Sequence, residues 1–168
     1  MSLFNLKHTY HTDLCADAEF EHNPNRCYII VGGIPYKNRK ISVAIPLRSN
    51  INAGFQSKKD EYIATVPTGK TRQGFIAGWH ITKAIPIDGA VAVKLNIANR
   101  QDLQIAEKIA KMQAKLFKEK TTAFIKRVEA GEKIFGAIDF DAALQKMDVL
   151  AAQIKEAFRK NVVFVKKI

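Results

Sequence analysis

A guanidinium, a hydroxyl and an amide stand together in Arg48-Ser49-Asn50, directly after the apolar residues Ile45-Pro46-Leu47. A planar guanidinium can bind two phosphate oxygens at once, and a neighbouring hydroxyl adds a further hydrogen bond. A second hydroxyl and cation stand together in Thr82-Lys83. These residue types suit a phosphate group, although either pair alone is also typical of an ordinary surface turn.

The segment over residues 40–45 has the β-branched composition of a strand. Proline lacks the amide hydrogen of a ladder, so Pro46 predicts the end of that strand. We therefore expect Arg48 and Ser49 at a rim where the chain turns back. Thr82 and Lys83 are expected to open another strand over 82–87, after a glycine turn at Gly78.

The first hundred residues are rich in strand patterns. Residues 26–31 are expected to pair antiparallel with 40–45, with glycines at 32–33 and the segment 37–39 bracketing the turn. Further short strands are predicted at 61–66, 74–76 and 91–95, and a loop at 50–60.

After residue 97 the pattern becomes helical. Residues 102–126 predict one helix, ended by Gly131, with a buried apolar face and a second face of lysines. The apolar face is Ile105, Ile109, Met112 and Leu116; the second face is Lys108, Lys111, Lys115 and Lys118. A face of lysines is either simply solvated or a track for phosphates.

A second helix is predicted from a cap at Asp139 or Asp141 to Arg159. Its buried residues are expected to be Leu144, Met147, Leu150 or Ala151, Ile154 and Phe158. Residues 162–165 predict a last strand or a docked extension. The chain is thus expected to be one α+β domain over 1–168, β-rich in 1–97 and mainly helical in 98–168.

The net charge of +11, from 27 Lys and Arg against 16 Asp and Glu, favours a polyanionic partner. A membrane-surface role is the weaker interpretation, because the basic helix lacks a bulky apolar face with Trp. The candidate RNA-binding residues are Lys37, Arg39, Lys40, Asn50, Lys58, Lys59, Lys70, Arg72, Thr82, Lys108, Lys111, Lys115 and Lys118.

No signal peptide or membrane span is visible, so we expect a cytoplasmic protein in which Cys15 and Cys27 are free thiols. No metal-ligand spacing of His, Cys, Asp or Glu is present, and we expect neither a metal nor another cofactor. RNA can be cleaved by its own 2′-hydroxyl if a protein positions the backbone, stabilises the added charge and moves protons.

The spacing of the two polar segments carries a family resemblance. Pro46-Leu47-Arg48-Ser49-Asn50 precedes Gly78 and the segment Thr82-Lys83-Ala84-Ile85 by about thirty residues, with a strand over 28–33 ahead of both. This arrangement resembles the toxin endoribonucleases of type III toxin–antitoxin systems. These are the ToxN/AbiQ-like group, and the similarity is to its CptN and TenpN branches.

The resemblance implies a twisted antiparallel sheet partly wrapped by helices and related to the MazF/Kid toxin fold. It implies metal-independent RNA cleavage that leaves a 2′,3′-cyclic phosphate. It also implies a pseudoknotted RNA antitoxin, processed by the toxin and bound with it in a closed protein–RNA assembly, beside cellular RNA as substrate. By position, Ser49 takes the place of the catalytic serine, Arg48 of its neighbour and Lys83 of the downstream lysine.

The chain departs from that pattern beyond the serine. Many relatives carry a basic residue or histidine there, whereas residues 51–55 here are Ile-Asn-Ala-Gly-Phe. The general acid or base is therefore open among Tyr10, His80 and Lys83. A non-catalytic basic RNA-binding module is the alternative function, because it explains the charge and the lysine face equally well.

Overall fold

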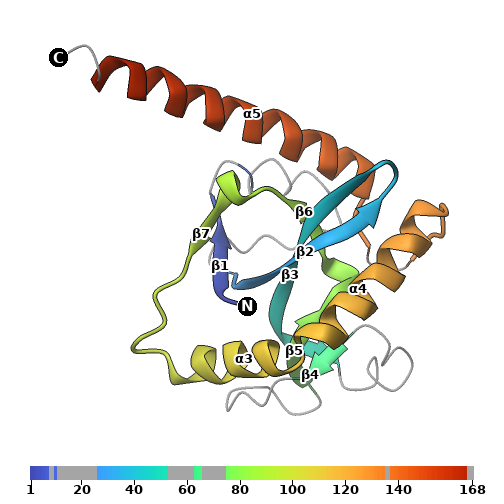
Figure 1. Ribbon diagram of the computed structural model, residues 1–168. Coiled ribbons are helices and arrows are strands. Elements are labelled where there is room, and N and C mark those ends of the chain that lie inside the picture. Colours follow the sequence, from blue (N-terminus) through green and yellow to red (C-terminus); the bar gives the residue numbers. More distant parts are fainter. Residues whose placement is uncertain (8–9, 11–25, 53–62, 66–74, 135–136, 166–168) are drawn as a thin grey trace.

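The computed structural model describes residues 1–7, 10, 26–52, 63–65, 75–134 and 137–165 (Figure 1). In that part of the chain, the strands precede the α-helices, and the architecture is the expected α+β fold. The strands are β1 Leu3–Leu6, β2 Tyr28–Tyr36, β3 Arg39–Asn52, β4 Ile63–Thr65, β5 Phe75–His80, β6 Ile85–Ile87 and β7 Ala92–Lys94. The helices are α3 Gln101–Met112, α4 Ala114–Glu129 and α5 Phe140–Val165, and the 3-10 turns are η2 Ile81–Lys83 and η3 Gly89–Val91.

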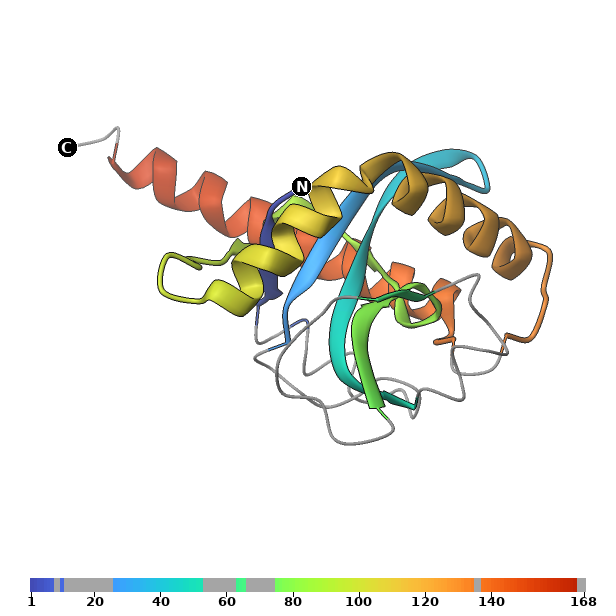
Figure 2. The same cartoon turned by 90° about the horizontal axis from the view of Figure 1, so that it is seen from below.

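One antiparallel sheet joins these strands in the order β4-β5-β3-β2-β1-β7, with β6 also paired to β3. The predicted pairing of 26–31 with 40–45 is confirmed, because Ile29 lies opposite Ile45 and Val31 opposite Val43. α4 packs against β2 and η2, while α5 packs against β6 and η3. The helices α3 and α4 therefore follow one side of the twisted sheet and α5 crosses the other (Figure 2).

Pro46 does not end its strand, so the expected rim at Arg48 is wrong. β3 continues for 14 residues to Asn52. On one edge β3 pairs with β6 through Ser42–Ala44 and with β5 from Leu47 onward. The amide of Leu47 donates to the carbonyl of Cys27 on the β2 side, so alternation directs the Pro46 nitrogen to the other edge. There it falls between the two partner strands, where no ladder bond is lost.

The glycines at 32–33 form a bulge rather than one side of the turn. β2 runs on to Tyr36, and its register against β3 shifts between Val31 and Ile34. Gly33 has φ +70°, a conformation that glycine adopts without steric cost. The turn itself is Lys37 and Asn38.

One strand prediction and one loop prediction are wrong in their bounds. Gly78 lies inside β5, and Thr82 and Lys83 lie in the 3-10 turn η2, so the strand expected over 82–87 is limited to β6. The loop predicted from residue 50 begins later, because β3 includes residues 50–52; residues 53–60 lie outside the described part.

The single helix predicted over 102–126 is two helices with a break at Gln113, and its predicted buried face is wrong except at Ile109, which is half-buried and packs against the core. Ile105, Met112 and Leu116 are 40%, 77% and 41% exposed. The buried residues are Leu103, Ala106 and Ala110 on α3 and Phe117, Thr121, Phe124 and Ile125 on α4. They lie roughly 120° around the helix from the predicted face, at 100° per residue.

The end of α4 follows the prediction. Gly131 adopts φ +78°. The amide of Gly131 donates to the Val128 carbonyl and that of Glu132 to the Arg127 carbonyl. This pair of bonds is a Schellman motif, which satisfies the last carbonyl groups of a helix.

α5 begins as expected and ends differently. Asp139 accepts a 3.0 Å hydrogen bond from the amide of Ala142, which confirms it as the cap. Leu144, Met147 and Ala151 are buried and Ile154 is half-buried, but Phe158 is 63% exposed. The backbone stays helical to Val165, so neither a strand nor a docked extension is present at 162–165. The helix extends beyond the sheet, and its C-terminal end projects from the body (Figure 1).

Cys27 is a free, half-buried thiol, as expected, and burial raises its pKa; Cys15 lies outside the described residues. None of the described helices is long and apolar enough to cross a membrane.

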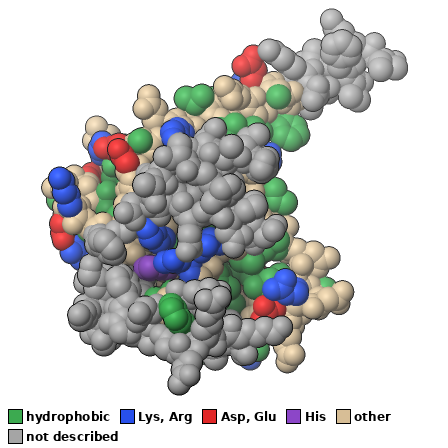
Figure 3. All heavy atoms as spheres, turned by 180° about the vertical axis from the view of Figure 1, so that it is seen from behind, with side chains coloured by type: hydrophobic (Ala, Val, Ile, Leu, Met, Phe, Trp, Pro, Cys, Tyr) green, Lys and Arg blue, Asp and Glu red, His purple; other side chains and the backbone are tan. Residues whose placement is uncertain are grey.

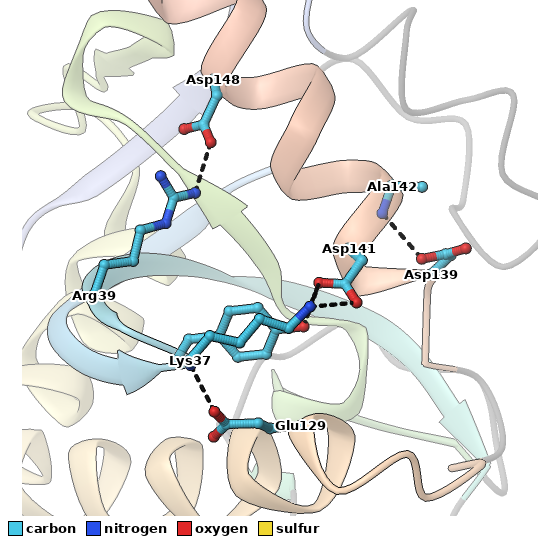
Figure 4. Close-up of polar contacts among 8 residues, drawn as sticks. Lys37, Arg39, Glu129, Asp139, Asp141, Ala142 and Asp148 are labelled. Atoms are coloured by element: carbon cyan, nitrogen blue, oxygen red, sulfur yellow. Dashed lines mark hydrogen bonds and ion pairs between the residues drawn. The ribbon is translucent and has the colours of Figure 1, made fainter.

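The β2–β3 turn is fixed to both long helices by polar contacts that we call the hairpin clamp (Figure 4). The Lys37 ammonium donates to both carboxylate oxygens of Asp141, at 2.8 and 2.9 Å, and the Tyr36 hydroxyl donates to the same carboxylate at 2.7 Å. The Lys37 amide donates to Glu129 at 2.6 Å. Lys37 has φ 49°, a backbone conformation that is unfavourable for residues other than glycine, and these bonds stabilise it.

A second ion pair completes the hairpin clamp. The Arg39 guanidinium donates to Asp148, which lies about two turns further along α5, at 2.7 Å. α5 therefore holds the hairpin through Asp141 and Asp148, which lie seven residues apart on the same side of the helix.

We predict that Asp141→Asn lowers stability at neutral pH but not in strong acid. The hydrogen bonds from Lys37 and Tyr36 hold the pKa of the Asp141 carboxyl below its ordinary value. A carboxylate with a depressed folded pKa stabilises the fold above the unfolded pKa of about 4, and this contribution is lost as pH falls through the folded pKa. Urea unfolding between pH 7 and pH 2 should show the two stability curves converging below about pH 4. Parallel curves would contradict the prediction.

Candidate functional site

The site is built on the paired strands β3 and β5. Leu47 lies opposite Trp79 and Arg48 opposite Gly78. His80 stands two residues after Gly78 and so lies on the same face of the sheet as Arg48, as a diagonal neighbour. Since Gly78 has no side chain, nothing from that residue separates the guanidinium from the imidazole.

A β-bulge interrupts the pairing directly after Arg48. Between the pairs Arg48–Gly78 and Ile51–Ile76, β3 contains Ser49 and Asn50 where β5 contains Ala77 alone. Such a bulge bends its strand and redirects side chains, and bulges are frequent beside active sites. Ser49 and Asn50 thus lie at the extra residue, although the structure describes only their backbone.

Arg48, His80 and Thr82 form a chain of hydrogen bonds. The Arg48 Nη1 atom lies 2.9 Å from Nδ1 of His80, and Oγ1 of Thr82 lies 2.7 Å from Nε2. His80 and Thr82 are buried, at 3% and 2% exposure, whereas Arg48 is half-buried. The chain therefore leads from the interior to the half-buried guanidinium beside the bulge. Figure 3 shows a histidine next to Lys or Arg side chains on this face.

The turn η2 places the second predicted pair. The Ala84 amide donates to the Ile81 carbonyl at 2.9 Å, which closes the turn. Thr82 points inward to His80, while Lys83 is half-buried. The structure therefore brings Arg48, His80, Thr82 and the backbone of Ser49 together, with Lys83 next to Thr82 in sequence.

Tyr10 occupies a different environment. Its side chain is fully buried, and its hydroxyl donates to the Pro86 carbonyl at 2.6 Å. Burial, and then the negative charge of Asp148, raise the pKa of Tyr10 above its ordinary range. The phenol is thus held as a neutral donor within the core.

The predicted RNA-binding residues separate into several groups. Lys37 and Arg39 belong to the hairpin clamp, and Lys40 is exposed on β3. Asn50 is described by its backbone only. Lys58, Lys59, Lys70 and Arg72 lie outside the described residues.

The four lysines of the helical face are all exposed. Lys111 pairs with Glu107 at 2.5 Å, and Lys115 lies 4.0 Å from Glu119. The Lys118 ammonium lies against the bulge at Gly33, 3.8 Å from the position that a Cβ atom there would take. A groove of about 580 Å³ follows this surface of α4, and its described lining is Lys115, Lys118, Glu119, Thr122, Ala123 and Lys126.

Sequence reasoning had named every member of the Arg48–His80–Thr82 chain but had not connected them. His80 was a candidate for proton transfer and Thr82 for RNA binding. The signal that connects them is the register, since pairing of Leu47 with Trp79 makes Arg48 and His80 diagonal neighbours. Within the described residues, no group of three or more His, Cys, Asp or Glu side chains could hold a metal ion.

No family model matches the amino-acid sequence, and no curated protein is similar to it. Solved structures, however, share its fold. AbiQ, a lactococcal anti-phage endoribonuclease of the type III toxin–antitoxin system, is similar with a TM-score of 0.67 at 13% identity, over 90% of this chain and 98% of AbiQ. A structure from a bacterial antiviral system regulated by a processed non-coding RNA gives 0.66 at 15% identity, over 88% and 98% of the two chains.

A third structure comes from work on type III systems in which a non-coding RNA pseudoknot selectively inhibits the toxin. It gives a TM-score of 0.56 at 15% identity, over 89% of this chain and 96% of that one. The relation to the MazF/Kid fold stays a prediction. The resemblance read from the two polar segments is confirmed at the level of architecture: the chain has the fold seen in AbiQ and in these type III toxin–antitoxin structures.

Proposed function

We propose that this protein is an endoribonuclease toxin of a type III toxin–antitoxin system. The observation that carries the proposal is the fold shared with an anti-phage endoribonuclease over 90% of the chain. The hydrogen-bonded Arg48 beside the bulge at Ser49 adds to it, since that is the segment with phosphate-binding residue types. The protein acts in the cytoplasm, where its RNA substrates are.

The proposed reaction needs only the RNA and the protein. The 2′-oxygen attacks the adjacent phosphorus as its proton passes to solvent water, the bond from phosphorus to the 5′-oxygen breaks, and the 5′-oxygen takes up a proton from Lys83, which regains one from solvent. The products are a 2′,3′-cyclic phosphate and a 5′-hydroxyl. Arg48 binds the non-bridging oxygens and Ser49 donates to the same phosphate, so both stabilise the added negative charge.

Lys83 is the proton-transfer residue in this proposal. Of the three candidates, Tyr10 is buried with its hydroxyl bound to Pro86, and both ring nitrogens of His80 are bound within the protein. Lys83 is half-buried in η2, next to Thr82. An ammonium group there can protonate the leaving 5′-oxygen.

We further propose that the protein is inhibited by a pseudoknotted RNA antitoxin, which it processes and with which it forms a closed assembly. Selective inhibition by an RNA pseudoknot is described for one of the proteins that share the fold. The net charge of +11 and the exposed lysines of α3 and α4 suit such a partner.

Purified protein should cleave total RNA in EDTA and leave 2′,3′-cyclic phosphate ends, and Ser49→Ala should lose at least about 100-fold in rate, the scale of one oxyanion donor. RNA binding and thermal stability should persist in this variant. Ser42→Ala, on the same strand but seven residues before Ser49, serves as the control. Full activity of Ser49→Ala would disprove the assigned site, and binding without cleavage by the wild type would favour a non-catalytic RNA-binding module.

Tyr10→Phe should lower the free energy of unfolding by about 1 kcal/mol, because the Pro86 carbonyl loses its buried donor. Cleavage of RNA should be unchanged, since the phenol is held within the core. Urea unfolding and a cleavage time course on the same preparation test both statements. A large loss of cleavage rate without a loss of stability would show that Tyr10 has a catalytic role.

Neutralising Lys115 and Lys118 together should weaken RNA binding without changing its sequence preference. If both lysines contact phosphates of a single strand, the slope of log K against log salt should fall by roughly 1.4, from about 0.7 per contact. Lys94→Gln, exposed on the edge strand β7, is the matched control. An unchanged salt slope would show that the lysine face is only solvated.

A further inference from the structure

We propose that His80 is a positioning residue for Arg48, held as the neutral tautomer with its proton on Nε2 by Thr82. This inference rests on the proposed function, because it assigns Arg48 to the scissile phosphate. In this proposal His80 does not transfer a proton. Its ring orients the guanidinium of Arg48 before RNA binds.

The donor and acceptor chemistry of the two contacts determines the tautomer. A guanidinium has only donors, so the 2.9 Å contact from Arg48 requires Nδ1 of His80 to accept. The single proton of the neutral ring then resides on Nε2, which donates to Oγ1 of Thr82 at 2.7 Å. A ring protonated on both nitrogens would instead direct an N–H toward the guanidinium.

Burial makes this acceptor rigid. At 3% and 2% exposure, His80 and Thr82 leave little room for water to replace either partner. His80 ends β5 and Thr82 lies in η2, so the ring is held between side chains from β3 and from the turn that follows its own strand. The half-buried guanidinium is thereby oriented by its contact with Nδ1 of His80, across from Gly78, which has no side chain.

Two amide variants of His80 separate orientation from proton transfer. In His80→Asn the side-chain oxygen takes the place of Nδ1 and can still accept from Arg48. In His80→Gln the amide reaches the place of Nε2, so the contact to Thr82 is kept and the acceptor for Arg48 is lost. We expect single-turnover cleavage by His80→Asn within about 5-fold of the wild type, and a loss of about 10- to 100-fold in His80→Gln, the scale of one charge-assisted hydrogen bond.

The outcomes are distinct. Equal, large losses in both variants would overturn the proposal in favour of proton transfer by the ring, and unchanged rates in both would show that the contact has no role. Thermal melting of each variant identifies a failure to fold. Affinity for an RNA with a 2′-deoxy group at the cleavage position should fall in His80→Gln as the rate does, because Arg48 binds the phosphate.

Thr82 provides the second pair of variants. Thr82→Ser keeps the hydroxyl acceptor and should keep the rate, whereas Thr82→Val has the same shape without it and should lose about 5- to 10-fold. In the His80→Asn background the Thr82→Val change should cost nothing further, since no ring remains to be oriented. An equal loss of rate from Thr82→Val in both backgrounds would show that Thr82 does not act through the ring of His80.

A measurement that needs no RNA keeps this inference separate from the proposed function. Two-bond proton–nitrogen correlations on the folded, ¹⁵N-labelled wild-type protein report the tautomer of each histidine ring, and His80→Asn identifies the signal. A fixed Nε2–H tautomer supports the proposal even if the protein cleaves no RNA. An Nδ1–H tautomer, or rapid exchange between the two, would overturn it.

Discussion

The hydrogen-bond ladder of β3 is the constraint on which the rest of the structure depends. β3 is 14 residues long; it pairs with β2 over residues 39–46 on one edge, and with β6 and then β5 on the other. The change of partner accommodates Pro46 and determines where β5 begins to pair. It therefore fixes which residue faces Arg48, and with it the whole hydrogen-bonded chain of the site.

The basic residues of this protein include one group that joins elements of the fold and another that lies on an exposed helical surface. Lys37 and Arg39 hold the hairpin to α5 through Asp141 and Asp148, whereas the lysines of α3 and α4 lie on an open face. A count of basic residues treats the two groups alike. The carboxylates that pair with Lys111 and Lys115 lie one turn away on the same helix, so a phosphate can replace them without separating two elements. A phosphate bound to Lys37 or Arg39 would instead have to break the hairpin clamp.

Local patterns predicted the parts of the fold that local chemistry determines. The pairing of the two central strands, the Asp139 cap and the glycine that ends α4 were all visible as residue types in sequence. The predictions were wrong where residues far away in the sequence determine the local structure. Pro46 is tolerated because two other strands meet beside it. α3 buries Ala106 and Ala110 rather than Ile105, and which face is buried depends on the surface that the helix packs against. The contact between Arg48 and His80 depends on register, which no single segment contains.

The bulge after Arg48 separates the requirements of the sheet from those of the site. Residues opposite each other in a ladder share a face, so Arg48 and Ile51 share a face although they are three positions apart. Removing one residue at Ser49 or Asn50 would leave regular alternation with Ile51 still opposite Ile76, so the sheet would keep its register. The deletion would remove only the local bend that redirects side chains beside Arg48. The fold can therefore tolerate a shorter segment here, whereas the site cannot.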